Sequence, residues 1–277
     1  MKPLTVIYGG GEFASCIATY LFHAALPVAM VVHPHQVYLR RPISLGEALN
    51  LGRKRIDEVE AVVVAPEILE RFPEGNWEEK WAKAIHFYTT DRKIPVFSVE
   101  DFPGFSTVLQ PQFLILSEMV PAAEDWVREI PVTIALHPGM EGELDYSFRI
   151  ETQWNYRLGK EFRPESGEIT DKFDLHFFKK PFSTVATPIA GTFVALKKIG
   201  DRVRTNEPLG TVDGIEIRSP YEGQIWGMFP AGRLISARAA LALIYQGKSG
   251  DEYLDFGFDH RAVAGTVLKI VLQQSSF

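Results

Sequence analysis

The chain is almost free of cysteine: Cys16 is the one such residue among 277. A single thiol excludes an internal disulfide and favours a reducing compartment. No apolar run reaches the roughly 18 residues that a membrane-spanning helix needs. The opening MKPLTVIYGGG breaks its apolar run with glycine too early for a signal peptide. These absences predict a cytoplasmic protein without a membrane partner.

Basic residues are fewer than acidic residues in this chain. Lys and Arg number 29 against 35 Asp and Glu, which gives a net charge of −6. A general nucleic-acid binder is usually basic, so we expect no nucleic-acid partner. With 46% hydrophobic and 23% charged residues, the composition is that of a globular protein long enough for more than one domain.

The first half of the chain alternates short apolar runs with segments of helical spacing. Continuous apolar runs indicate strands that are buried on both faces. Helical spacing is found at 13–25 and 77–88. The expected strands are 4–8, 27–32, 61–64, 94–99, 113–116 and 132–136. The opening strand, glycine turn, helix and strand form a βαβ unit, so we predict an α/β, Rossmann-like layered domain over 1–150.

A glycine-rich turn joins the first strand to the first helix. Gly9, Gly11 and Ala14 satisfy G-x-G-x-x-G/A, and Gly10, Glu12 and Phe13 complete the segment. Such a turn lets a phosphate approach the backbone, and the helix N-terminus supplies free N–H groups. The pattern therefore predicts a nucleotide-binding segment over 9–14. The alternative is a tight strand-to-helix turn that holds no ligand.

An acidic residue is missing where a dinucleotide site usually has one. The segment after the second strand, 31–36, reads VVHPHQ. Without an acid to hold the ribose hydroxyls, NAD is a weaker candidate. Arg40 and Arg41 follow, and they either meet a phosphate or lie on a solvated face. His33 and His35 have no evident third ligand nearby, so we expect no metal site.

A second loop completes the expected crevice. His137, Pro138 and Gly139 follow the predicted strand 132–136. In open α/β sheets, ligands collect at the carboxyl ends of strands, so this loop and the glycine turn are expected to face one crevice. The alternative is an ordinary Pro-Gly turn.

The second half contains an internal repeat. Residues 187–212 and 219–244 align without a gap at an offset of 32, matching Pro188 with Pro220 and Gly191 with Gly223. One supersecondary unit used twice, with short strands punctuated by Gly and Pro, predicts a small β-barrel or sandwich. We place this domain at 184–246, after a strand-containing connector at 151–183 and before a C-terminal segment at 247–277.

The repeat resembles the biotinyl/lipoyl-type barrel-sandwich hybrid, most closely in KKIGDRVRTNEPLGTV. In carrier members of that family, a lysine at the tip of the hairpin between the two halves takes the cofactor. No lysine stands between Lys198 and Lys248 here. We therefore expect no lipoyl or biotin, and a structural or docking role instead.

Several stretches along the chain resemble, in the same order, the accessory proteins of a selenium-dependent molybdenum hydroxylase system. They are VIYGGGEFASCIA, YLRRPISLGEAL, KIPVFSVED, VTIALHPGMEGELDYSFRIET, RLG and the KIGDRV-containing domain. The resemblance implies a Rossmann-like front and a barrel-sandwich back. It also implies a role in maturing or assisting a molybdenum hydroxylase, with that enzyme or its maturation proteins as partners.

Three functional hypotheses follow. The first is a non-catalytic accessory protein that binds a nucleotide-type ligand, of unknown identity, and docks on a partner enzyme. The second is an NAD(P)-dependent oxidoreductase, for which His137 is the best candidate proton donor although no catalytic dyad or triad is evident. The third is a structural module whose glycine turn is empty.

Overall fold

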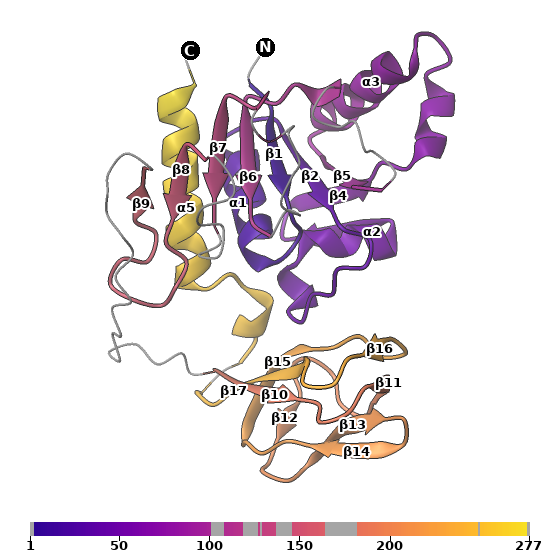
Figure 1. The fold of residues 1–277 in the computed structure, drawn as a ribbon, viewed down its shortest axis with the longest axis vertical. Coiled ribbons are helices and arrows are strands. Elements are labelled where there is room, and N and C mark those ends of the chain that lie inside the picture. Colours follow the sequence, from indigo (N-terminus) through magenta and orange to yellow (C-terminus); the bar gives the residue numbers. More distant parts are fainter. Residues whose placement is uncertain are drawn as a thin grey trace. The chain divides into compact units, whose positions relative to one another are not determined.

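The chain folds into two units, each built from segments that are not consecutive in sequence (Figure 1). The computed structural model describes residues 3–100, 108–118, 127, 129–136, 146–163, 182–248 and 250–275. The first unit lies within Met1–Gln36, Ile43–Leu175 and Phe256–Phe277, and the second within Val37–Pro42 and His176–Asp255. The sequence-based division used consecutive segments. It therefore did not assign residues 37–42 to the second unit or the last helix to the first.

A mixed sheet organises the first unit. In the described residues its strand order is β3-β4-β5-β2-β1-β6-β7-β8-β9. The strands from β4 to β8 are parallel to their neighbours, whereas β3 and β9 pair antiparallel at the two edges. Their bounds are β1 Thr5–Tyr8, β2 Val28–Val32, β3 Arg53–Ile56, β4 Val59–Val63, β5 Ile94–Ser98, β6 Phe113–Leu116, β7 Val132–Ala135, β8 Phe148–Ile150 and β9 Glu161–Phe162.

The helices of this unit cover the sheet. The α-helices are α1 Glu12–His23, α2 Ala48–Leu51, α3 Trp77–Thr90 and α5 Phe258–Gln274. Short 3-10 turns of this unit occur at η2 Leu45–Glu47 and η3 Pro66–Arg71. The turn η1 Arg41–Ile43 lies where the chain passes from the second unit to the first, and η6 Glu252–Leu254 belongs to the second unit. Helix α3 begins at a capping box, in which Asn76 Oδ1 accepts from Glu79 N (2.9 Å) and Glu79 Oε2 accepts from Asn76 N (3.2 Å). Within the described residues, no helix combines the length and the hydrophobicity needed to cross a bilayer.

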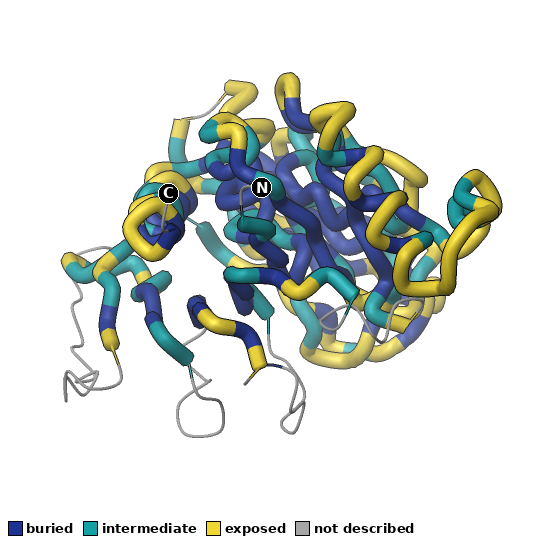
Figure 2. The backbone as a smooth tube through the Cα atoms, turned by 90° about the horizontal axis from the view of Figure 1, so that it is seen from above, coloured by how far each residue is buried: buried dark blue, intermediate teal, exposed yellow. Residues whose placement is uncertain are grey.

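The core of the first unit lies along both sides of the sheet. Trp81, Ile85 and Tyr88 of α3 belong to the same buried hydrophobic cluster as Val6 and Tyr8 of β1. Figure 2 shows the strands running through the middle as buried backbone, with exposed residues around them. Helices α1 and α5 lie side by side (Figure 1). The strands and the two helices expected from periodicity are confirmed, because each coincides with an element of this layered α/β unit.

The second unit consists of two antiparallel sheets. In the described residues the strand orders are β10-β17-β15-β12 and β14-β13-β11-β16. The bounds are β10 Phe182–Ala186, β11 Gly191–Ala195, β12 Arg202–Val203, β13 Pro208–Val212, β14 Ile215–Arg218, β15 Gly223–Met228, β16 Leu234–Ile235 and β17 Ala240–Tyr245. Its core includes Phe193, Leu209 and Leu241, all fully buried.

The predicted repeat appears in this unit as reciprocal hydrogen bonds between the two halves. A bond from the first half to the second is matched, at the offset of 32, by a bond from the second to the first. Such pairs are Gly200 N to Ile225 O with Gly232 N to Phe193 O (2.7 Å each), and Ile225 N to Asp201 O (2.9 Å) with Phe193 N to Arg233 O (3.0 Å). Gly200 and Gly232 also share a positive φ, at 96° and 79°. The two halves are therefore related by an approximate two-fold rotation.

Candidate functional site

The glycine turn follows β1, the strand at which the order of the strands in the sheet reverses. Strand β1 is flanked by β2, which follows it in the chain, and by β6, to which the chain returns later. Ligands of open α/β sheets bind outside the carboxyl ends of the strands at such a switch point. The residues that leave this edge are Gly9–Gly11 after β1 and Ser117 and Glu118 after β6.

Gly9 is the position that requires glycine. Its φ is +119°, which L side chains rarely adopt, and an added Cβ would lie 2.4 Å from Ser117 Oγ. Gly9 N donates to Val31 O (2.8 Å), and Ser117 N donates to Tyr8 O (3.0 Å). The turn is therefore pressed against the start of the loop after β6.

The carbonyl groups of the turn point into the protein. Gly10 O accepts from Gly46 N (3.0 Å), and Gly11 O accepts from Ser15 N (2.9 Å) and Ser15 Oγ (2.7 Å). A trans peptide holds its N–H opposite its C=O. The N–H groups of Gly11 and Glu12 therefore point away from η2 and from the body of α1, as an anion-binding turn requires.

Ser15 locks this arrangement in place. Its side chain is fully buried, and its Oγ also accepts from Leu45 N at 2.7 Å. One hydroxyl thus joins α1 to η2 and to the glycine turn, which fixes the turn before any ligand arrives.

A carboxylate of the protein lies on the turn. Gly10 N donates to Glu118 Oε1 across 3.1 Å. A backbone N–H at a glycine turn next to a helix N-terminus is the kind of donor that phosphate oxygens use. Glu118 therefore makes, from within the chain, a contact that a phosphate ligand would make.

The second carboxylate at the turn is directed elsewhere. The buried imidazole of His260 lies between two acids, with Nε2 3.4 Å from Glu12 Oε2 and Nδ1 3.2 Å from Asp259 Oδ1. Gly257 N also lies 2.9 Å from Nδ1, and Phe13 packs on the ring with centroids 4.8 Å apart. His260 thus holds the Glu12 carboxylate against α5, which reduces its repulsion of an anion at the turn.

Comparison with known proteins gives little beyond this geometry. No family model matches the sequence. The uncharacterized protein YqeB of Escherichia coli K12 is 22% identical over 286 aligned positions, which cover 98% of this chain and 49% of YqeB. The chain thus spans about half the length of this curated relative.

The solved structures with some likeness have low sequence identity to this chain. They include the ectoine utilization protein EutE (DoeB) of Ruegeria pomeroyi, with 12% identity over 88% of this chain and 85% of that one. An aspartoacylase family protein of Mesorhizobium loti has 11% identity over 90% and 87%. Both TM-scores are 0.25, which does not establish a shared fold.

The predicted site residues are divided between the two units. Gly9–Ala14 form the turn and the start of α1 in the first unit. Arg40 and Arg41 belong to the second unit. His137, Pro138 and Gly139 lie outside the described residues. The strand before them, β7, is parallel to β6, which is parallel to β1, so β1 and β7 end at the same edge of the sheet.

The arginine pair anchors a segment to the second unit. The Arg40 guanidinium lies 5.2 Å from the Trp226 ring centroid, and it donates to Asp255 O (3.3 Å). Arg41 donates to the carbonyl of Met228. Because Arg40 is only 7% exposed, the alternative of a solvated face is wrong for this residue. Arg40 packs on the Trp226 indole, and both arginines donate to backbone carbonyl groups of the second unit. These contacts give both residues a structural role.

Two other residues discussed in the sequence analysis, or lying in segments discussed there, make local contacts. The hairpin between β13 and β14 turns at Asp213-Gly214, and Asp213 Oδ1 accepts from Thr192 N at 2.7 Å. His35 Nε2 lies 3.8 Å from Glu100 Oε1. Within the described ranges, no group of three or more His, Cys, Asp or Glu side chains could hold a metal ion.

Sequence reasoning missed Ser15, Glu118 and His260. Glu118 carried a usable signal, since it follows the buried run FLIL, and strand ends of this type collect site residues. Ser15 and His260 carried none, because their roles depend on contacts with η2 and between α5 and α1 that no local pattern encodes.

Proposed function

We propose that this chain is a non-catalytic accessory protein of a molybdenum hydroxylase system, which binds a nucleotide-type ligand at the glycine turn. The observation that carries the proposal is the position of Gly9–Gly11 at the switch point of the sheet, with the carbonyl groups of the turn directed inward. The co-linear resemblance to the accessory family supplies the biological context. Catalysis is not part of the proposal.

The proposed ligand places a phosphate on the N–H groups of Gly11 and Glu12. Binding there also draws on the N-terminal end of the α1 dipole. The phosphate must displace Glu118 from Gly10 N, because two anions on neighbouring donors of one turn repel each other. We therefore expect a modest affinity that rises when Glu118 loses its charge.

The second unit is proposed to be a barrel-sandwich hybrid of the biotinyl/lipoyl type that serves in docking. The approximate two-fold relation between its halves supports this fold. Asp213 at the hairpin tip has its carboxylate bonded to the backbone of β11, and no lysine is present there to carry a cofactor. A partner hydroxylase or one of its maturation proteins is the proposed docking target.

One observation favours a second candidate, a structural module with an empty turn. The bond from Gly10 N to Glu118 satisfies a donor of the turn without any ligand. An internal carboxylate in this place neutralises the positive end of α1 and stabilises the strand-to-helix connection. In that case, the glycines serve only the close approach of Ser117 and Glu118.

Calorimetric titration separates these candidates. NADP, NAD and cytidine nucleotides are titrated side by side into the wild-type chain and into Gly11→Val, whose backbone (φ −71°, ψ −170°) accommodates valine. The proposal expects saturable binding of at least one nucleotide, lost in Gly11→Val because the side chain covers the N–H groups. Heat changes that never saturate with any nucleotide would support the structural module.

The system assignment has its own test. A strain that lacks this chain is expected to accumulate the molybdenum hydroxylase polypeptide at its normal level but with reduced activity. Restoring the wild-type gene should recover the activity. Equal hydroxylase activity with and without the chain would contradict the accessory role, whatever the titration shows.

A further inference from the structure

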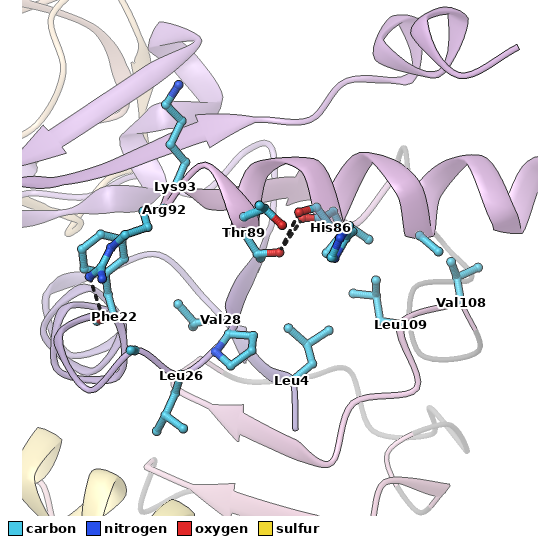
Figure 3. Close-up of a pocket in the computed structure, with 15 residues that line it drawn as sticks. Leu4, Phe22, Leu26, Val28, His86, Thr89, Arg92, Lys93, Val108 and Leu109 are labelled. Carbon is cyan, nitrogen blue, oxygen red and sulfur yellow. Dashed lines mark hydrogen bonds between the residues drawn. The ribbon is translucent and has the colours of Figure 1, made fainter. Parts of the chain in front are cut away.

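A cavity of about 460 Å³ lies at the edge of the sheet opposite the glycine turn (Figure 3). It is lined by Leu4 just before β1, the residues that lead into β2, the C-terminal ends of α1 and α3, and residues shortly before β6. All of these belong to the first unit. In Figure 3, Phe22 and Arg92 lie at one end of the cavity and Val108 and Leu109 at the other.

Most of the cavity wall is apolar. The aliphatic side chains that line it are Leu4, Leu26, Val28, Ile85, Val108 and Leu109. Pockets of roughly 300–1,000 Å³ with such walls and a few convergent polar groups are typical of small-molecule sites. The volume and lining therefore suit a compact ligand with an apolar or aromatic body.

The polar groups of the cavity are donors or cations. His86, Thr90 and Arg92 line it from exposed positions at the C-terminal end of α3 and just beyond. The Arg92 guanidinium lies 4.7 Å from the centroid of the Phe22 ring and donates to Phe22 O (3.4 Å). Among the described residues, no carboxylate lies within 4 Å of it. Its charge is therefore available to an anion while its plane is held by stacking.

Lys93 is a contrasting cation on the same rim. Its ammonium lies 2.7 Å from Asp91 Oδ2 and 3.9 Å from Glu60 Oε2. The hydrogen bond that Lys93 donates to Asp91 raises the pKa of Lys93, so Lys93 stays protonated and paired. Its side chain also points away from the cavity in Figure 3. Arg92, rather than Lys93, is thus the cation placed to meet a ligand.

We propose that this cavity binds a small molecule with an apolar or aromatic body and a single acidic group, which pairs with Arg92. A guanidinium fork suits a carboxylate or sulfonate, and the stacked Phe22 ring fixes its orientation. His86 and Thr90 supply further donors at the mouth. The site is independent of the nucleotide proposal, because it lies at the amino ends of the parallel strands.

The test uses the full chain and the dye anilinonaphthalene sulfonate, an aromatic body with one sulfonate, followed by fluorescence. We expect saturable binding of one dye per chain. Ala82→Trp, which adds bulk at a residue that lines the cavity, is expected to weaken binding at least about tenfold. The matched control is Phe87→Trp, a neutral change at an exposed position of the same helix that does not line the cavity.

The role of Arg92 has a separate readout. Arg92→Gln should weaken the sulfonate dye about tenfold while leaving the uncharged N-phenylnaphthylamine unaffected, because only the former loses a charged partner. Melting temperatures confirm that each variant is folded. Failure of the wild-type chain to saturate, or equal loss in both tryptophan variants, would overturn the site. Equal loss of the charged and the neutral dye in Arg92→Gln would overturn the ion pair. Nucleotide titrations run in parallel keep the failure of this site distinct from failure of the proposed function.

Discussion

At the scale of single residues, the glycine turn depends on a few contacts that no neighbouring sequence could replace. Gly9 has a backbone conformation that is unfavourable for other residues and a close approach to Ser117. The Glu118 carboxylate accepts a hydrogen bond from Gly10 N, and the Glu12 carboxylate lies against the His260 imidazole. The glycine pattern predicted the turn correctly. It did not predict what the turn touches, because those partners come from the residues after β6 and from α5, more than 100 residues away in the chain.

Gly9→Ala is expected to destabilise the first unit by ~1–3 kcal/mol, since the new Cβ meets both a strained φ and Ser117. The matched control is Gly265→Ala in α5, where nothing lies within 4 Å of an added Cβ. Alanine there should stabilise the unit by ~0.5–1 kcal/mol through helix propensity. Denaturant unfolding followed by helical circular dichroism reports on the first unit, because the described α-helices all belong to it. Equal shifts of the same sign would contradict the strained turn.

The ion pair of Lys197 and Glu207 should make the second unit sensitive to acid. The hydrogen bond from Lys197, followed by that from Arg204 N, lowers the pKa of Glu207 below its ordinary value of 4.5. A lowered folded-state pKa means that this stabilisation is present above pH 4.5 and is lost as the pH falls through the folded value. Glu207→Gln should therefore flatten the loss of stability below that pH. Melting of the second unit, measured between neutral pH and pH 3, checks this, with the exposed Glu222→Gln as control. If Glu207→Gln loses as much stability at low pH as the wild-type chain, the pair of Lys197 and Glu207 is not the cause of the acid sensitivity.

At the scale of elements, periodicity was a sufficient guide where an element packs on its sequence neighbours. The buried strands β1, β2, β5, β6 and β7, with helices α1 and α3, were all predicted from it. Helix α5 was not, although Val263, Val267, Ile270 and Val271 follow a helical spacing, because Gly265 and many β-branched residues weaken the local propensity. Packing on α1 overrides that weakness.

Docking of α5 gives a prediction at this scale. Ile270 is 1% exposed, so Ile270→Ala should cost about 2–5 kcal/mol of the stability of the first unit. Leu272, two residues further on the same helix, is 42% exposed, and Leu272→Ala should change stability by less than about 0.5 kcal/mol. Urea unfolding monitored at the helical signal measures both. Similar small effects would mean that α5 contributes little to the core of the unit.

At the scale of the whole molecule, each of the two units is built from separate segments of the chain rather than from one continuous stretch. Val37–Pro42 belongs to the second unit, where Met228 N donates to Leu39 O (3.0 Å) and an added Cβ at Gly227 would lie 3.1 Å from Leu39 C. The last helix belongs to the first unit. Sequence reasoning found the repeat and the layered sheet because both leave local periodic signals. It assigned Arg40 to a ligand site or to solvent, because burial beside Trp226 depends on a contact that spans most of the chain.

The nucleotide proposal requires competition between a nucleotide phosphate and the Glu118 carboxylate for the same face of the glycine turn. Its most direct measurement is the calorimetric affinity of Glu118→Gln, compared with the wild-type chain, for the nucleotide that binds best. Removing the charge should raise that affinity at least about tenfold, the scale of a charged hydrogen bond. An affinity that is unchanged or weaker in Glu118→Gln, or the absence of binding in both proteins, would contradict the claim.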